Sequence, residues 1–296
     1  MRRLLPLIFV ACSSVSSTPV QPSTFASPAA QHTCPRLDRP VVTGAVVDPR
    51  LPEISSVLVS RKHPGTLWVL NDSGNAAVLF AITTAGTVVG SYTVEGAQNL
   101  DWEGLGQRFE NGKHWLYIAD TGDNLHIRNQ GTVYIVEEPD TLVQGGSVRV
   151  TKEVALSYAS NKRENVEAFA VEPTSGAFYF FSRGDEQGVA TLFRRDASLE
   201  KVNAFSFKLE GVRGSDLTTS ADFDSKGERF IMRTYVAAYL WTRDPNESWT
   251  SAFARTPCLF ALDKDTQGEA IAFDDSGFFT LSEKLGAPIR HYALHD

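Results

Sequence analysis

One pattern recurs five times along the chain: a short cluster of small or acidic residues opens a hydrophobic strand, and a second strand follows that ends on polar residues. The openings are separated by about 48 to 64 residues and show no helical periodicity. They are Ile54-Ser55-Ser56, Trp102-Glu103-Gly104, Val166-Glu167-Ala168, Thr219-Ser220-Ala221 and Gly268-Glu269-Ala270. Strand repeats of this length are typical of sheets arranged as blades around an axis. The sequence therefore predicts an all-β fold, a β-propeller with five blades, or with six if residues 139–160 or 243–265 contain a further sheet.

The outer strands of the fifth and fourth blades are less obvious from the repeat. The fifth blade has only three strands of its own, within residues 270–294, and Val41–Val47 (VVTGAVV) is predicted to supply the missing outer strand. Closing the ring with an N-terminal strand removes an exposed sheet edge. In the fourth blade the outer strand is either Ser248–Ala254 or Leu259–Leu262. The propeller domain is accordingly predicted to span residues 41–296.

The N-terminus has the features of an export signal. Arg2 and Arg3 are positively charged, and the eight residues after them are apolar. Residues 1–11 are therefore predicted to be a signal peptide. Residues 9–12 (FVAC) resemble a bacterial lipobox with Phe where Leu is usual, which makes Cys12 the lipidation site of a protein anchored to the bacterial cell envelope. Cleavage after Ala30, giving a soluble secreted or periplasmic protein, is the alternative. Residues 12–40, rich in Ser, Thr and Pro over most of their length, are predicted to be an anchor and flexible tether.

The chain has three cysteines, so lipidation of Cys12 leaves Cys34 and Cys258. In an exported protein two remaining thiols are expected to form a disulfide. The loop that this bond closes exceeds 200 residues, and for such a loop the chain-entropy model predicts about 4 to 5 kcal/mol of stabilisation. The alternative is a buried Cys258 beside a free Cys34.

Charge and hydropathy restrict the partners. The formal net charge is −7, which argues against nucleic-acid binding because that function needs a basic surface. No segment after the N-terminus is apolar enough to span a bilayer as a helix, so membrane contact is expected only through the N-terminal lipid. We expect a monomer whose partner is a small anionic ligand, presented with a cation, or a surface protein.

A first group of polar residues predicts a cation site. Asn71 and Asp72 end one strand, and Asp120 and Asp123 flank a Gly bend after another. Carboxylate and amide oxygens are the ligands that Ca²⁺ prefers. With Glu103 between them, these residues are predicted to form a Ca²⁺ site at the mouth of the channel. The alternative is that they cap turns by bonding to local backbone amides.

A second group of polar residues is predicted to form a ring. Equivalent positions of the five openings are expected around one end of the channel, namely Ser55, Glu103, Glu167, Ser220 and Glu269. Glutamates that face one another repel, so they need a metal, protons or cationic partners. Arg183 and Arg233 end strands of the third and fourth blades and, with Glu269, are predicted to bind an anionic substrate. The alternative is structural ion pairing of Glu167 with Arg183 and of Glu269 with Arg233.

The ordered motifs carry a family resemblance. The segments NDSG (71–74), DWEG (101–104) and LYIADTGDN (116–124), with later pieces around Glu167, Tyr235 and Glu269, resemble a family of exported bacterial β-propeller proteins of unknown function. The resemblance covers roughly residues 45–294, and it departs at Gly104, where the family more often carries Asp. More distantly, the acidic openings are similar to those of the calcium-dependent lactonase and esterase-like phytase propellers.

Two functional hypotheses follow. In the first, an exported, lipid-anchored β-propeller is a ligand- or protein-binding module with an acidic site at its channel mouth. In the second, it is a calcium-dependent hydrolase of esters, lactones or phosphoesters. A cation near Asn71, Asp72, Glu103 and Asp120 then polarises the scissile group, and the catalytic base is Glu103 or Glu167. The sequence leaves both hypotheses open.

Overall fold

The computed structural model describes residues 33–157, 164–184, 188–195 and 199–296. The predicted signal peptide, Cys12 and most of the predicted tether lie outside the described residues. The chain divides between Thr33 and Cys34, and the fold is that of the unit from Cys34 to Asp296. None of the helices in the described part of the chain has the length and apolar character needed to cross a membrane.

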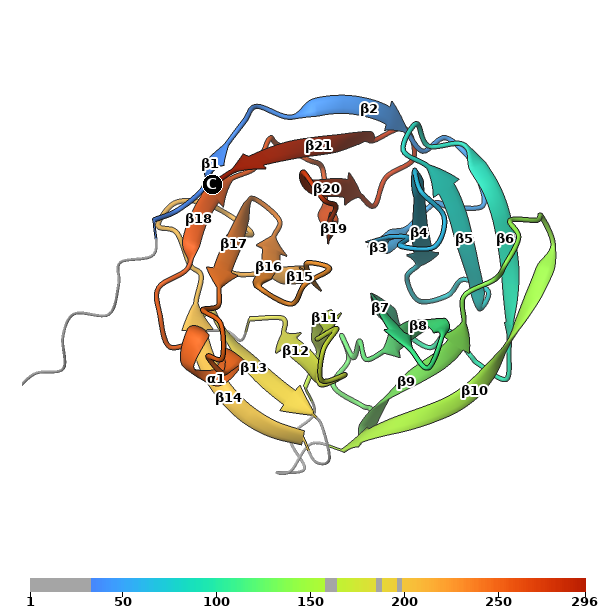
Figure 1. Cartoon of the computed structure of the whole chain (residues 1–296), viewed down its shortest axis with the longest axis horizontal. Helices are drawn as coiled ribbons and strands as arrows, with labels where there is room; N and C mark the ends of the chain where they lie inside the picture. The colour runs from blue at the N-terminus through green and yellow to red at the C-terminus, as the bar shows by residue number, and fades with distance from the viewer. Residues whose placement is uncertain (1–32, 158–163, 185–187, 196–198) are drawn as a thin grey trace, which may run out of the picture. The chain divides into compact units, whose positions relative to one another are not determined.

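Twenty of the described strands form five groups of four around a central axis (Figure 1), and the short strand β1 pairs at the edge of the fifth group. The prediction of an all-β β-propeller is confirmed. Blade one contains β3 (Ile54–Val59), β4 (Thr66–Asn71), β5 (Val78–Thr83) and β6 (Val88–Glu95). Blade two contains β7 (Trp102–Glu110), β8 (Lys113–Asp120), β9 (Gln130–Glu137) and β10 (Gly146–Ser157). Their outer strands β6 and β10 also pair with each other, in parallel.

The other three blades repeat this arrangement. Blade three contains β11 (Val166–Val171), β12 (Phe178–Ser182), β13 (Val189–Arg195) and β14 (Leu199–Ser206). Blade four contains β15 (Thr218–Phe223), β16 (Arg229–Thr234), β17 (Ala237–Thr242) and β18 (Cys258–Ala261). Blade five contains β19 (Gly268–Phe273), β20 (Gly277–Ser282), β21 (Pro288–His295) and β2 (Val41–Ala45). The first strand of each blade lies nearest the axis (Figure 1).

The N-terminal strand closes the ring as predicted. β2 pairs antiparallel with β21, with Val41 opposite His291. β1 (Arg36–Leu37), which lies inside the range predicted as tether, pairs with the end of the same strand. At the junction with blade one, the hydroxyl of Thr43 donates to the carbonyl of Thr84 at 2.7 Å. The backbone of Gly44 lies so close to Ala85 that a Cβ there would collide with it.

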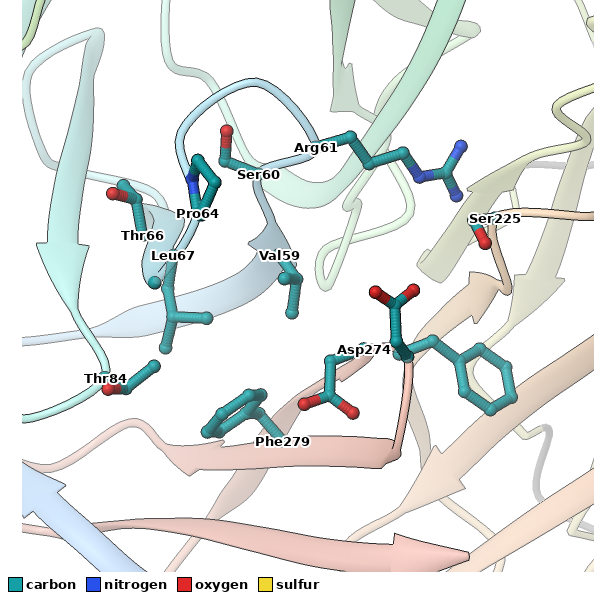
Figure 2. A pocket seen from close by; sticks show the side chains of 13 residues that line it. Val59, Ser60, Arg61, Pro64, Thr66, Leu67, Thr84, Ser225, Asp274 and Phe279 are labelled. Atoms are coloured by element: carbon teal, nitrogen blue, oxygen red, sulfur yellow. The ribbon is translucent and has the colours of Figure 1, made fainter.

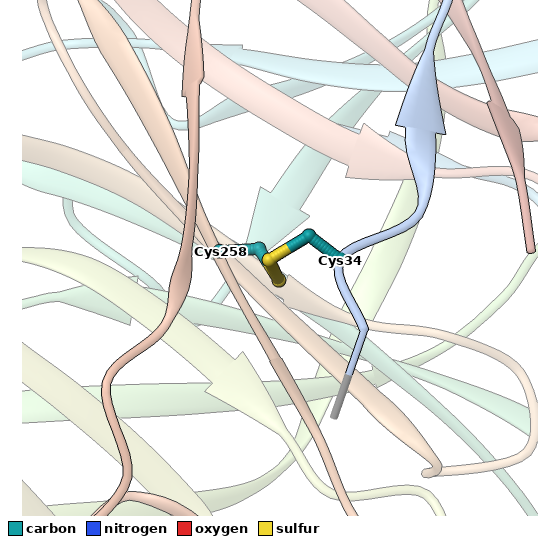
Figure 3. Close-up of a disulfide and its surroundings, with 2 residues drawn as sticks. All are labelled: Cys34 and Cys258. Atoms are coloured by element: carbon teal, nitrogen blue, oxygen red, sulfur yellow. A yellow bond between two sulfur atoms is a disulfide. The ribbon is translucent and has the colours of Figure 1, made fainter. Parts of the chain in front are cut away.

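The disulfide is also confirmed. Cys34 precedes β1 on blade five and Cys258 begins β18 on blade four, and their sulfur atoms are bonded with the Cα atoms 5.5 Å apart (Figure 3). The bond therefore joins the start of the domain to the neighbouring blade.

The outer strand of blade four is the later of its two predicted candidates. The candidate at 259–262 coincides with β18, whereas the candidate at 248–254 contains the helical turn α1 (Trp249–Ala252). Ser248 is its N-cap, and the Ser248 side chain accepts a hydrogen bond from the amide of Ser251. A serine followed by a bulky apolar residue thus begins a helix here, because the cap satisfies an amide that the first helical turn leaves free. Trp249 is buried against Phe223 and Phe230.

Candidate functional site

A β-bulge in each blade shapes one end of the channel. In all five pairs of first and second strands the register shifts at the same place, so that one residue of the first strand has no partner opposite it. Bulges re-aim side chains and are frequent next to functional sites. The bulged residues are Ser55, Glu103, Glu167, Thr219 and Glu269.

In blades one, two, three and five the bulged residue is the one predicted for the ring. In blade four the bulge lies one residue earlier than predicted. Ser220 pairs with Arg233 in the regular ladder, and its Oγ accepts a hydrogen bond from the amide of Ile271 at 3.3 Å. The bulged residue is its neighbour Thr219, whose hydroxyl donates to the carbonyl of Gly268 at 3.0 Å. Ser55 makes the same kind of bond to the carbonyl of Trp102 at 2.7 Å. Short hydroxyl residues thus tie one blade to the next.

A second ring lies directly after the second strands. Each member directly follows the last residue of its second strand, and the members are Asp72, Thr121, Arg183, Tyr235 and Glu283. Backbone hydrogen bonds hold four of them equivalently. The donors are the amides of Asp72, Thr121, Arg183 and Glu283, and the acceptors are the carbonyls of Glu53, Asp101, Asn165 and Gln267, at 2.8, 3.1, 2.8 and 3.0 Å respectively. In this register the counterpart of Arg183 is Tyr235.

Most members of the two rings line a polar cavity of about 200 Å³. Among the described residues that line it, five carry carboxylates and one carries a guanidinium. The carboxylates belong to Asp72, Glu103, Glu167, Glu269 and Glu283, and the guanidinium belongs to Arg183. The cavity is thus strongly acidic.

The cation of the cavity is already paired. Arg183 donates to Oε1 of Glu167 at 2.8 Å and to the hydroxyl of Tyr235 at 2.7 Å. Asn165 donates to the same oxygen of Glu167 at 2.7 Å. The predicted alternative of a structural Glu167–Arg183 ion pair is therefore what the structure contains. The role of Arg183 in binding an anion stays a prediction, since it requires release of these partners.

Arg233, the other arginine predicted for the site, lies away from the cavity. It is fully buried, it does not line the cavity, and its nearest carboxylate among the described residues is that of Asp265 at 3.5 Å. Its Nη1 donates to the carbonyls of Ala270 and Leu281 at 2.9 and 3.3 Å. The expected pair of Arg233 with Glu269 is thus replaced by a pair with Asp265. The reason is register: Arg233 precedes the end of its strand and points between blades four and five instead of toward the mouth.

Three of the four predicted metal ligands have structural roles. Asp120 forms an ion pair with Arg128 at 2.7 Å and accepts a hydrogen bond from the amide of Asp101 at 3.0 Å. Asp123 accepts from the amides of Ile127 and Arg128 at 2.8 and 2.9 Å, which caps the loop. Asn71 donates to the carbonyl of Arg50 at 2.8 Å. These contacts match the alternative of local structural roles, and of these four residues Asp72 lines the cavity, together with Glu103.

A carboxylate that the sequence prediction did not select completes a cluster. Oxygen atoms of Asp72, Asp101 and Glu103 lie within 4.8 Å of one another. Asp101 directly precedes the first strand of blade two, where blades one, three and five carry Glu53, Asn165 and Gln267. The recurrence of polar residues at this position was a signal from which Asp101 could have been chosen.

Burial and mutual repulsion shift the acidity of the site. Burial, followed by repulsion from Glu167 and Asp72, raises the pKa of Glu103 well above its usual value. Burial and a hydrogen bond with Asp72 raise the pKa of Asp101 to about 7. Burial and the charge of Glu167 raise the pKa of Glu269 to about 7. The negative charge of the cavity is thus incompletely compensated by the protein.

A larger cavity of about 490 Å³ lies at the opposite end of the first strands, beside the β3–β4 and β19–β20 turns (Figure 2). Val59, Leu67 and Phe279 form its apolar part. Its Asp274 accepts hydrogen bonds from the amides of the following turn and lies 3.0 Å from His291, so this carboxylate is used in local structure. The uncompensated charge is at the smaller cavity.

The chain matches no family model and no curated protein. Among solved structures, it is similar to the major allergen Mala s 1 of Malassezia sympodialis, with 11% sequence identity and a TM-score of 0.51 over 85% of this chain and 94% of that chain. It also matches a chain of a nidogen/laminin complex, with 10% identity and a TM-score of 0.46 over 77% of this chain and 72% of that chain. At such identities the likeness to Mala s 1 shows the fold alone. Membership of the exported bacterial family stays a prediction.

Proposed function

We propose that this protein is a binding module that holds a cation, or the cationic group of a ligand or partner protein, in the acidic cavity at its channel mouth. The observation that carries the proposal is the charge of the cavity, where five carboxylates surround one guanidinium that is already paired with Glu167. A recess lined by one sign of charge concentrates ions of the opposite sign.

The scaffold suits recognition. The acidic side chains stand on bulges and strand ends, positions that backbone hydrogen bonds fix, and such rigid elements hold a binding site in place. Leu125 follows Asn124, which lines the cavity, and Leu100 precedes Asp101; the two leucines are exposed at 78% and 57%. Exposed apolar residues next to a polar recess favour a ligand or surface protein that carries apolar groups beside its positive charge.

We also propose that the protein acts outside the cytoplasm, attached through lipid on Cys12. The disulfide between Cys34 and Cys258 supports this, because such bonds persist in oxidising compartments. Labelled fatty acid should enter the protein in a bacterial host that processes lipoproteins, and the Cys12→Ser variant should remain unlabelled. Equal labelling of both would show that Cys12 is not the anchor.

Calorimetry tests the binding proposal. The purified protein is titrated with Ca²⁺, Mg²⁺, spermidine and argininamide at low and high salt. We expect at least one of these cations to bind, to bind more weakly at high salt, and to lose at least tenfold in affinity in the Glu103→Gln variant. Asp275→Asn, in the other cavity, should bind as the wild type does. If none of the cations binds at millimolar concentration, the proposal is wrong.

A second candidate is metal-dependent hydrolysis of esters, lactones or phosphoesters. It is favoured by the pKa of about 7 at both Asp101 and Glu269, since general acids and bases work best near the operating pH. Lactone, carboxylester and phosphoester substrates should be screened with and without Ca²⁺. Turnover that survives Glu103→Gln would remove that residue from the mechanism, and the absence of turnover on all three classes would end this candidacy.

A further inference from the structure

Three carboxylates from two neighbouring blades converge on one side of the acidic cavity. Asp72 follows the second strand of blade one, Asp101 precedes the first strand of blade two, and Glu103 is the bulged residue of that strand. Their oxygen atoms lie within 4.8 Å of one another. Asn99 donates to the carbonyl of Asp72 at 2.9 Å, and Asp120 accepts the amide of Asp101, so the backbone is held on both sides.

Carboxylate oxygens of Glu103 and Asp101 lack hydrogen-bond partners among the described residues. Glu103 is 4% exposed, and no hydrogen bond or ion pair to its carboxylate is found in the described part of the chain. Asp101 is 8% exposed, and its Oδ1 has no hydrogen-bond partner among those same residues. Glu167 in the same cavity, by contrast, is bound by Arg183 and Asn165. Buried carboxylate oxygens without donors are costly, so this side of the cavity is built for a group that supplies positive charge.

A glycine leaves room for the carboxylates of Asp101 and Glu103 to lie close together. Gly122 lies directly behind the two carboxylates, where a Cβ would be 2.6 Å from Oε1 of Glu103 and would overlap the carboxylate of Asp101. Its amide donates to the carbonyl of Asp101 at 3.1 Å. A side chain at this position would push both carboxylates away from their present places.

We propose that Asp72, Asp101 and Glu103 form a binding site for a divalent metal ion of the Ca²⁺ type. This inference rests on the proposed function and names its cation. The donors are all oxygen, which selects hard cations over Zn²⁺ or Cu²⁺. Oxygens around Ca²⁺ lie 2.3–2.6 Å from the ion, so a coordination sphere is about 4.6 to 5.2 Å across, whereas that of Mg²⁺ is about 4 Å. The oxygen atoms of the three carboxylates lie within 4.8 Å of one another, so all three fit within a coordination sphere of the Ca²⁺ size.

The site leaves coordination positions for a ligand. Three carboxylates supply three to six oxygens, whereas Ca²⁺ takes six to eight. Asp72 and Glu103 line the cavity, so the remaining positions on that side are filled by water or by an oxygen of the bound molecule. An anionic ligand would then bind through the metal ion, with Arg183 in the same cavity.

Two measurements test the metal site on the full chain. Titration with CaCl₂ should give binding that falls at least tenfold in Asp101→Asn and in Glu103→Gln, and less than threefold in Glu269→Gln, which alters the same cavity away from the cluster. Thermal unfolding gives an independent readout. In EDTA, Glu103→Gln should unfold at the same or a higher temperature than the wild type, because it relieves repulsion; in millimolar Ca²⁺ the order should reverse.

The outcomes separate the two proposals. If Ca²⁺ does not bind but spermidine or argininamide does, the metal site is wrong and the proposed function stands. If no cation binds, both are wrong. An equal loss in Glu269→Gln and Glu103→Gln, or an unchanged order of unfolding temperatures in Ca²⁺, would also overturn the assignment to these three residues.

Discussion

Arg183 donates a hydrogen bond of 2.8 Å to Oε1 of Glu167, which lies on the neighbouring strand of the same blade at the mouth of the channel. Glu167 is nearly inaccessible, with 4% of its side chain exposed, while Arg183 keeps 25% of its own. The pair is therefore mostly withdrawn from water, and removing one partner leaves a buried charge without compensation.

The first prediction concerns this pair. Arg183→Met should lower the free energy of unfolding by about 3 kcal/mol at neutral pH, because the buried carboxylate of Glu167 loses its guanidinium partner. The double variant Arg183→Met with Glu167→Gln should recover most of that loss. Urea unfolding followed by circular dichroism measures both. A double variant no more stable than the single one would show that the pair is not what stabilises this side of the mouth.

The second prediction concerns Gly122. In Gly122→Ala the new methyl group meets Asp101 and Glu103, so affinity for Ca²⁺ should fall at least tenfold, with about 1 to 3 kcal/mol of destabilisation from overpacking. Calorimetry and urea unfolding give the two values. Gly90→Ala is the matched control, since its Cβ would lie 3.1 Å from Tyr92, away from the site. Wild-type affinity in Gly122→Ala would contradict the role given to this glycine.

The third prediction is a pH dependence at Asp222, away from the mouth. Its oxygens accept hydrogen bonds from the amides of Phe223 and Phe273 at 2.8 and 2.9 Å, and Arg61 and Asp224 are the charged groups that act on it. Burial raises its pKa from 3.8 to about 7. A raised pKa means that the folded state holds the proton more tightly, so the contribution of Asp222 to stability is greatest below pH 3.8 and is lost as the pH rises to about 7.

The size of this effect can be measured against Asp222→Asn, which does not titrate. Between pH 4 and pH 8 the stability of the wild type should fall relative to the variant by about 4 kcal/mol in total, at up to about 1.4 kcal/mol per pH unit. Urea unfolding of both proteins at several pH values gives the difference. Parallel pH profiles would mean that Asp222 titrates normally in the fold.

The fourth prediction concerns the disulfide. Cys34 and Cys258 are 224 residues apart in the sequence, and a crosslink over such a span restricts the unfolded chain strongly. Cys34→Ser should therefore lower the free energy of unfolding by about 4 to 5 kcal/mol. The variant with both cysteines replaced should match it, since the crosslink and not either side chain supplies the stability. Guanidinium unfolding of the oxidised protein and of the variants decides the point.

Much of the fold could be predicted because repetition and strand periodicity are properties of the sequence. The fifth blade's outer strand and the cysteine pair followed from counting strands and thiols. The exact register did not follow, because a β-bulge inserts one residue that a period of two does not reveal. In Thr218-Thr219-Ser220 three similar hydroxyl residues stand in a row, and the prediction chose Ser220 where the structure has Thr219 at the bulge.

The same one-residue uncertainty explains the differences at the site. The sequence pattern predicts equivalent positions in their blades for Arg183 and Arg233. In the structure Arg183 follows its strand, whereas Arg233 lies within one. Asp120 and Asp123 were grouped with Asp72 because they are close in sequence to a Gly bend. Whether such a carboxylate faces a cavity or caps its own loop depends on side-chain direction, which residue type and spacing do not determine.

Blade five has a consequence for how the chain is made. Its outer strand β2 is among the first parts of the domain to be synthesised, and its partner β21 is the last. Until Pro288–His295 has been added, Val41–Ala45 has no strand to pair with. Cys34 has no disulfide partner until Cys258, which precedes β21 in the chain, has been added. A chain that ends before β21 is therefore an open ring with unpaired edges, and only a chain that includes this strand can close.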